Sequence, residues 1–404
     1  MRYLIVEEAL RDGRGHWPTY IGGIAAGLRS RGDSVDILAH RHASADLLRQ
    51  LHAIPCLRKS CWEDQQSQGM VGGLRHNASF QRDLAGYLQR TARYDWVMAL
   101  TVRLQHLAAF ACLARKGTQC RQTQFLLLFV QGFGQYAGDG SPVVFPRSGS
   151  TLFARLCFRL MRPAVMAGRI HLAAETVGMQ TEMERFTGLP WALFPHPVEF
   201  SASAKQSVIT SSRSGTVTIT CPGFARHEKG SDLLQEAIKQ MLSGAGAEQL
   251  RFVLQWPTPF ALPDGRLLGP DPVLLSDSRV TFLNHSLNAT DYDQLLDMSD
   301  LVVLPYRRHA YHNRVSRVAI EAASRGIPLV YTSGTWSGEV AALSGAGVEI
   351  AKETVPATVE ALRQAIANLP NLRARAVQGA HRVAAYHSVD QFRRKMVTLA
   401  SGRD

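Results

Sequence analysis

Short apolar runs alternate with helical patterns through the first half of the chain. Residues 3–6 and 34–39 are β-like runs, and residues 19–31 between them show a helical period. The alternation continues with β-like runs at 96–100, 123–130, 170–174 and 192–195, and with helical patterns ending near 115 and spanning 178–187. Strands that alternate with helices in this way predict a parallel, doubly wound α/β sheet.

A second series of the same kind follows residues 201–214. That segment is rich in Ser and lacks an apolar period, which predicts a linker. β-like runs recur at 216–220, 251–255, 280–283, 301–305 and 328–332, with helical patterns at 231–242, 292–298 and 315–325. We therefore expect a first domain over 1–200, a linker over 201–214, a second domain over 215–385, and a C-terminal helix over 386–404 packing back on the first domain.

The predicted fold class is α/β, with two Rossmann-like doubly wound domains facing each other across a cleft. A chain of 404 residues is too long for one hydrophobic core, which agrees with two domains. Ligands of open α/β sheets bind beyond the carboxyl ends of the strands. The cleft is therefore the expected site.

The sequence predicts a cytosolic protein. Glu7 and Glu8 break the first apolar run, so it is read as a strand and not as a signal sequence. No apolar stretch approaches the ~20 residues that a membrane-spanning helix needs. The six cysteines form no C-x-x-C pair and are expected to be reduced.

The charge is positive and uneven. The formal net charge is +12, of which residues 1–200 contribute +8, from 23 Lys and Arg against 15 Asp and Glu. No nucleic-acid-binding motif accompanies this charge, so nucleic acid is not an expected partner. Phosphorylated substrates or an anionic membrane surface fit the charge better.

Two cations stand where the second domain's first strand ends. The segment PGFARHEKGSDLLQEA contains Gly223, then Arg226 and Lys229, and then Ser231 as the expected N-cap of a helix. An Arg and a Lys at a strand end, just before a helix N-terminus, can converge on a diphosphate and stabilise a leaving group. The alternative is a solvated basic loop.

A buried acid is predicted further along the second domain. The strand at 301–305 leads through a polar loop to a helix in which Glu321 stands among apolar and small residues. A carboxylate there is costly unless it is paired or lines a cleft. It could accept hydrogen bonds from a ribose, while the helix N-terminus near Ser316 and Arg317 faces phosphate. The alternative is an ordinary surface-facing Glu.

In this order, the segments resemble the family 4 retaining glycosyltransferases of the GT-B fold, over nearly the whole chain. Members show a G-x-x-R-x-x-K-G segment, matched here by Gly223, Arg226, Lys229 and Gly230. They also show a strand ending in Pro, an E-x7-E pattern and G-x-P-V-V. Residues 301–305, Glu321 and residues 326–330 match these, although Asn313 replaces the first Glu.

The resemblance implies residue roles and substrates. Arg226 and Lys229 would hold the diphosphate and Glu321 the ribose, without a required metal or other cofactor. The donor-binding set would be Gly15, Asn313, Arg314, Ser316, Arg317 and Glu321. The resemblance also implies that the first domain is the acceptor side and that the second domain binds the nucleotide sugar, a UDP- or GDP-linked donor. Because Asn carries no charge, the donor sugar cannot be taken from the family.

The first domain offers weaker signals. Gly13, Gly15 and His16 follow the first strand, where the family places a Gly-rich loop, and His16 is a candidate catalytic residue. An ordinary turn is the alternative. Gln131 stands where relatives often have a His, which excludes a proton acceptor there but leaves sugar binding open.

Residues 151–169 carry a basic stripe formed by Arg155, Arg159, Arg162 and Arg169. A basic amphipathic helix can lie on an anionic membrane surface, although Pro163 is expected to interrupt this one. A solvated basic face is the alternative. Peripheral contact with the cytoplasmic face of the inner membrane would suit a lipid-linked acceptor.

The sequence thus favours a retaining hexosyltransferase-like enzyme that moves a sugar to a glycan or lipid-linked acceptor in surface polysaccharide biosynthesis. A GT-B-type nucleotide-sugar epimerase is one alternative, although no carboxylate set for it is evident in the first domain. A non-catalytic scaffold subunit is the other, which Asn313 favours and which Arg226 and Lys229 disfavour.

Overall fold

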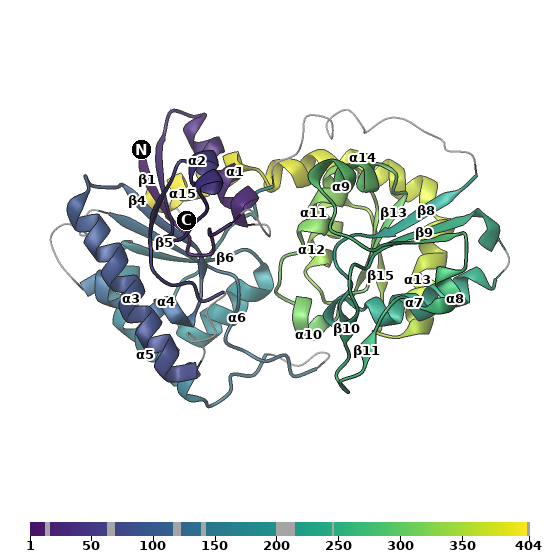
Figure 1. Ribbon diagram of the computed structural model, residues 1–404, viewed down its shortest axis with the longest axis horizontal. Coiled ribbons are helices and arrows are strands. Elements are labelled where there is room, and N and C mark those ends of the chain that lie inside the picture. Colours follow the sequence, from purple (N-terminus) through teal and green to yellow (C-terminus); the bar gives the residue numbers. More distant parts are fainter. Residues whose placement is uncertain are drawn as a thin grey trace. The chain divides into compact units, whose positions relative to one another are not determined.

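The computed structural model describes residues 1–12, 17–62, 69–115, 123–138, 143–198, 215–244 and 246–401. The chain divides into two compact units, shown in Figure 1. The first comprises Met1–Pro197 with Ser388–Asp404, and the second comprises Val198–His387. The predicted linker, residues 201–214, lies outside the described residues.

Seven parallel strands form the sheet of the first unit, in the order β3-β2-β1-β4-β5-β6-β7. They are β1 (Arg2–Val6), β2 (Ser34–His40), β3 (Ala53–Leu57), β4 (Trp96–Val102), β5 (Gln124–Phe129), β6 (Ile170–Ala174) and β7 (Ala192–Leu193). The direction of winding reverses between β1 and β4, which makes the sheet doubly wound as predicted.

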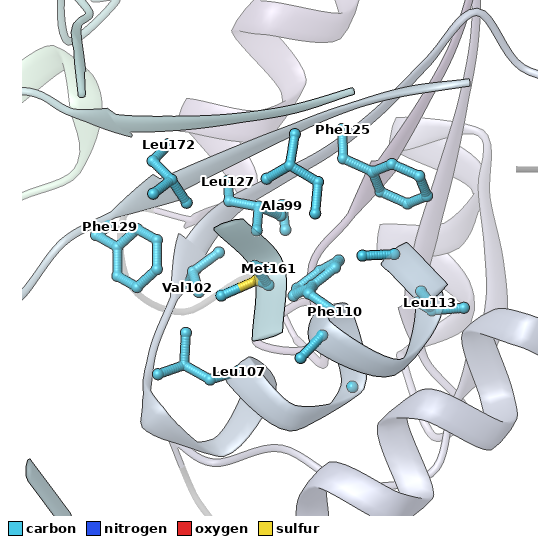
Figure 2. Close-up of a cluster of buried hydrophobic side chains, with 14 of the residues drawn as sticks. Ala99, Val102, Leu107, Phe110, Leu113, Phe125, Leu127, Phe129, Met161 and Leu172 are labelled. Carbon is cyan, nitrogen blue, oxygen red and sulfur yellow. The ribbon is translucent and has the colours of Figure 1, made fainter. Parts of the chain in front are cut away.

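Helices cover both faces of this sheet. One face carries α3 (Gly69–Arg90), α4 (Leu104–Arg115), α5 (Gly149–Met166) and α6 (Val177–Thr187). The other carries α1 (Trp17–Arg29), α2 (Ala45–Leu51) and α15 (Val389–Ala400). All seven residues of β4 are buried, because its side chains alternate between two covered faces. Figure 2 shows Phe110 of α4 and Met161 of α5 packed against strand residues such as Leu127.

The second unit repeats this architecture with six parallel strands, in the order β12-β9-β8-β13-β14-β15. They are β8 (Val217–Cys221), β9 (Leu250–Gln255), β12 (Val280–Leu283), β13 (Leu301–Leu304), β14 (Leu329–Thr332) and β15 (Gly347–Ile350). Here the winding reverses between β8 and β13. The carboxyl ends of these two strands are therefore the expected place for a ligand.

Helices again cover both faces. One face is packed by α7 (Ser231–Leu242), α13 (Val355–Ala367) and the start of α14 (Leu369–Tyr386). The other is packed by α9 (Ala289–Asp297), α11 (Arg317–Ser324), α12 (Ser337–Ser344) and the end of α14. The short elements are η3 (His227–Lys229), η4 (Ala247–Gln249), the hairpin of β10 (Phe260–Ala261) and β11 (Leu267–Leu268), α8 (Pro272–Leu275) and α10 (Arg308–Tyr311).

Two local predictions were wrong. Gly230, in the left-handed conformation, is the N-cap of α7, and Ser231 is the first helical residue. The Ser231 hydroxyl instead accepts a hydrogen bond from the Arg226 backbone N–H at 3.1 Å. Pro163 does not interrupt α5, which continues to Met166. Pro163 lies in the last turn of α5, so few residues of the helix follow it.

The C-terminal helix α15 packs on the first unit. Its Phe392 is fully buried and meets the Phe194 ring at a centroid distance of 4.9 Å. Arg393 donates to Asp33 at 3.0 Å, and Asp33 also binds the N-terminal ammonium at 2.9 Å. The C-terminal helix therefore helps to fix the position of the N-terminus through Asp33.

None of the helices in the described part of the chain is long and apolar enough to cross a membrane.

Candidate active site

The loop after β8 is pressed tightly against the end of β13. A Cβ atom on Gly230 would lie 1.9 Å from the carbonyl oxygen of Pro305, and the Gly230 φ is +66°. Only glycine fits such a contact with such a backbone. Gly223, also left-handed at φ +85°, would bring a Cβ within 2.6 Å of the Lys229 Nζ. These two glycines let the loop fold back so that Lys229 lies over the strand end.

Three cations gather at this place. The charges of Arg226 and Arg314 both act on Lys229 and lower its pKa. Arg226 is half-exposed and lies 3.5 Å from Glu228, and the exposed Arg314 guanidinium lies 5.3 Å from the centre of the Tyr311 ring. Within the described residues, Lys229 has no carboxylate partner at ion-pair distance. Glu228 offsets only part of the charge of these three cations, and the excess positive charge favours an anionic ligand.

Burial of Lys229 lowers its pKa to about 8, and the neighbouring Arg226 and Arg314 add to the shift. An anion bound here would stabilise the ammonium and raise that pKa again. Anion affinity is then fully present below pH 8 and falls as pH rises through it.

We therefore expect the affinity for a diphosphate ligand to fall by up to about tenfold per pH unit above pH 8. Isothermal titration between pH 7 and 9.5 measures this fall. In Lys229→Arg, whose charge persists throughout, the affinity should stay flat. Equal slopes in both proteins would contradict the assignment.

Glu321 is buried and held by two donors. Tyr292 on α9 donates to one carboxylate oxygen at 2.8 Å, and the Nε of Arg317 donates to the other at 2.7 Å. These bonds supply the pairing that a buried carboxylate requires. Each oxygen keeps a further lone pair for a ligand hydroxyl. In the described structure, Glu321 forms no ion pair with Arg226 or Lys229.

The other predicted donor-binding residues of the second unit lie at the start of α11 or in the loop before it. Ser316 is its N-cap, and the Ser316 hydroxyl accepts from the Ala319 N–H at 3.3 Å. Asn313 and Arg314 stand in the loop between α10 and α11, with Asn313 half-buried. The structure thus brings Arg226, Lys229 and Arg314 together, and places Arg317 in a bond within the helix, to Glu321.

Of the predicted site residues in the first unit, the structure describes Gln131 and not Gly15 or His16. Gly15 and His16 lie outside the described residues. Gln131, exposed just beyond β5, accepts a hydrogen bond from the Arg103 guanidinium at 3.3 Å. Gln131 therefore lies at the carboxyl edge of the sheet, next to a cation from the neighbouring strand.

Sequence reasoning missed buried carboxylates at this edge. Glu7 is fully buried beyond β1, and burial raises its pKa to about 7 even though Thr101 donates to it at 2.7 Å. Glu175, beyond β6, accepts from Tyr20 at 2.9 Å and lies 2.8 Å from His196 Nδ1. The folding of the strands and of α1 against one another brings these residues together, and no sequence spacing does. The one signal in the sequence for these carboxylates was an acidic residue directly after a buried strand.

Glu8 lies in a buried group with Cys61, His76 and His106. Although burial opposes it, His106 and His76 hold the pKa of Glu8 well below its ordinary value. Glu8, Cys61 and His106 are close enough to hold a metal ion. However, His106 Nδ1 accepts from the Arg103 backbone N–H at 3.0 Å, so its Nε2 carries the proton and faces Glu8 at 3.2 Å. That tautomer makes His106 a donor and not a ligand.

No protein-family model and no curated protein sequence matches the chain. Solved structures do match, over nearly the whole chain. A glycosyltransferase from Rickettsia africae aligns with a TM-score of 0.66 at 13% identity, covering 100% of this chain and 98% of that one. Anabaena HepE in complex with UDP-glucose aligns with a TM-score of 0.62 at 15% identity, covering 99% and 100%.

A third structure carries a different activity in its name. It is a putative UDP-N-acetylglucosamine 2-epimerase from Listeria monocytogenes, with a TM-score of 0.58 at 12% identity and coverage of 100% and 97%. At such identities the likeness establishes the fold. The chain has the GT-B fold, as the resemblance predicted.

Proposed function

We propose that the protein is a glycosyltransferase that moves a sugar from a nucleotide diphosphate sugar to a glycan or lipid-linked acceptor. The observation that carries this proposal is the group of Arg226, Lys229 and Arg314 at the carboxyl ends of β8 and β13. Winding of the sheet reverses there, and a diphosphate matches the charge. HepE, which shares the fold, was solved with UDP-glucose.

In the proposed reaction, Arg226 and Lys229 stabilise the negative charge that develops on the departing diphosphate. Glu321 accepts hydrogen bonds from the ribose, and Asn313, Arg314, Ser316 and Arg317 complete the donor site. Gly15 and His16, which lie outside the described residues, are the remaining donor-binding and catalytic candidates of the proposal. The proposal includes retention of configuration, no required metal, and a role in surface polysaccharide biosynthesis at the cytoplasmic side of the inner membrane.

The test is a panel of UDP- and GDP-sugars, with and without EDTA. Nucleotide affinity is measured by calorimetry, nucleotide release by coupled assay, and acceptor mass by mass spectrometry. Donor affinity should fall in Arg226→Ala and stay unchanged in Arg375→Ala, which removes an exposed arginine on α14. Failure of the wild type to bind any nucleotide would overturn the proposal and leave a non-catalytic scaffold.

A nucleotide-sugar epimerase is the second candidate, because acids do lie at the strand ends of the first unit. The near-neutral pKa of Glu7 suits proton transfer, and a putative epimerase shares the fold. Against it, Glu7 is fully buried, and Glu8 and Glu175 are already bonded to His side chains. The same panel separates the two activities, since an epimerase converts the donor with no acceptor present.

Peripheral membrane contact is proposed for α5. Leu152, Leu156 and Leu160 form one exposed row of this helix, beside exposed Arg155 and Arg159. The sequence from residue 140 to 174 contains five Arg and no Asp or Glu. Exposed leucines flanked by arginines match an anionic bilayer surface.

Sedimentation with phosphatidylcholine vesicles that contain phosphatidylglycerol measures this contact. Because each surface Arg contributes about 1 kcal/mol, Arg155→Ala/Arg159→Ala should lower the partition coefficient by about 30-fold. The control Arg82→Ala/Arg375→Ala removes two exposed arginines on α3 and α14. Equal loss in both double variants would leave general charge as the cause.

A further inference from the structure

Arg307 binds the loop that carries Arg226 and Lys229. It stands between β13 and α10 and is the N-cap residue of α10. Its backbone N–H donates to the carbonyl oxygen of Glu228 at 3.0 Å. Its side-chain Nε donates to the carbonyl oxygen of His227, also at 3.0 Å. One residue beyond β13 thus binds two successive carbonyls of the loop that follows β8.

Two carboxylates fix the side chain of Arg307 in this position. Its Nη2 donates to Asp232 Oδ2 on α7 at 2.5 Å, and its Nη1 lies 3.6 Å from Glu353 Oε2, between β15 and α13. Glu353 is itself held, because its other oxygen accepts from the Arg308 backbone N–H at 2.7 Å. The Arg307 side chain is only 14% exposed, so solvent and salt screen these ion pairs little. Its orientation is therefore set by groups from three separate segments.

Arg307 is not a further cation of the diphosphate site. Its single positive charge faces the negative charges of both Asp232 and Glu353, so it has no excess charge to offer an anion. Its Nε and Nη2 donors are already bonded within the protein. Arg307 therefore acts on the anion site through the loop that it holds, and not by direct contact.

The loop depends on support from outside. Its helical segment η3 has only three residues, and a single turn of this kind is marginal without tertiary contacts. Gly223 and Gly230 allow the backbone to fold back, but glycine also loses the most conformational freedom when it becomes ordered. Burial of Lys229 adds a cost, because it removes water from the ammonium. The two bonds from Arg307 supply part of the support that offsets these costs.

We propose that Arg307 is a positioning residue that keeps this loop in the folded-back form that binds a diphosphate, with the Lys229 ammonium over the strand end. Without the two bonds, Lys229 moves toward solvent. The cation would still attract an anion there, but it would no longer stand where charge develops. The effect on sugar transfer rests on the proposed function. A misplacement of about 1 Å can lower a rate by about 100-fold, so Arg307 contributes to kcat more than to donor affinity.

Binding of inorganic pyrophosphate tests the position of Lys229 without any activity. Calorimetry between pH 7 and 9.5 should show the wild-type affinity falling above pH 8. In Arg307→Gln the fall should move toward pH 10.5, the ordinary pKa of lysine, because a solvated ammonium escapes the burial that lowers its pKa. The titration of pyrophosphate itself is the same in both proteins and cancels in the comparison.

Other groups also act on the Lys229 ammonium, and all of them remain in the variant. They are Cys221, Arg226, Glu228 and Arg314. Arg307→Lys separates position from charge, since it keeps the positive charge and loses the planar fork that binds the loop and Asp232 together. It should move the fall in the same direction by a smaller amount. If circular dichroism shows that Arg307→Gln is unfolded, Arg307→Lys alone carries the test.

The matched control is Arg279→Gln. Arg279 also combines an ion pair, to Asp277 at 2.6 Å, with a bond to a backbone carbonyl, that of Leu242 at 3.3 Å. It stands directly before β12, at the amino end of that strand, so its loss should leave pyrophosphate binding as in the wild type. The proposal is overturned if Arg307→Gln and the wild type show the same pH dependence, or if the wild type binds no pyrophosphate.

Kinetics separate this proposal from the proposed function. With the donor that the nucleotide-sugar panel identifies, Arg307→Gln should lower kcat by up to about 100-fold and raise the donor KM by less than about threefold. Arg307→Lys should recover part of kcat. A kcat within about threefold of wild type overturns the role of Arg307 in transfer. If the wild type uses no nucleotide sugar, the transferase is overturned, and the pyrophosphate titration still decides whether Arg307 positions the loop.

Discussion

Replacing Lys229 with alanine is expected to lower the kcat of sugar transfer by about 100- to 1000-fold. The ammonium is held by the folded-back loop, and its pKa of about 8 keeps it mostly charged at neutral pH. In the proposed reaction, charge on the diphosphate grows as the sugar leaves. An interaction that strengthens in the transition state lowers kcat when it is removed.

The measurement is steady-state kinetics with the donor that the nucleotide-sugar panel identifies. Lys229→Arg should recover part of kcat, because it restores the charge with a different shape. Arg375→Ala should match the wild type. Circular dichroism melting checks that each variant is folded. A kcat for Lys229→Ala within about threefold of wild type would remove Lys229 from the chemistry.

The core strands could be predicted from the sequence because both faces of each sheet are covered. Such strands are continuous apolar runs, as β4 and β13 are. The edge strand β3 was missed, because it contains Pro55 and its residues are mostly half-exposed. Helix α3 was missed because its glycines and polar residues blur the helical period.

The candidate site was predictable only where its residues are close in sequence. Arg226 and Lys229 are three positions apart, so one loop displays both. The Tyr292 hydroxyl on Glu321 comes from a separate helix, and no spacing could have revealed it. Trp62 and Arg103 follow β3 and β4, and they meet only because both strands end at the carboxyl edge of the same folded sheet. Contacts of this kind depend on strand order, which a linear pattern does not give.

Replacing Phe392 with alanine is expected to lower the free energy of unfolding of the first unit by about 3 to 5 kcal/mol. Phe392 is fully buried against Phe194, although some 200 residues of sequence separate the two. Its helix also packs so tightly that a Cβ on Gly27 would lie 2.5 Å from Val389. The cavity left by the ring would be walled by α1 and the sheet, which cannot close over it.

Hydrogen exchange resolved by mass spectrometry can assign this loss to one unit, which a single melting curve of a two-unit chain cannot. Amides of α1 and β1 should exchange faster in Phe392→Ala, and amides of α7 and β8 should not change. The matched control is Val397→Ala, at an exposed position of the same helix, with an expected effect within about 0.5 kcal/mol. If exchange in α7 rose as much as in α1, the C-terminal helix would be stabilising the whole chain and not the first unit alone.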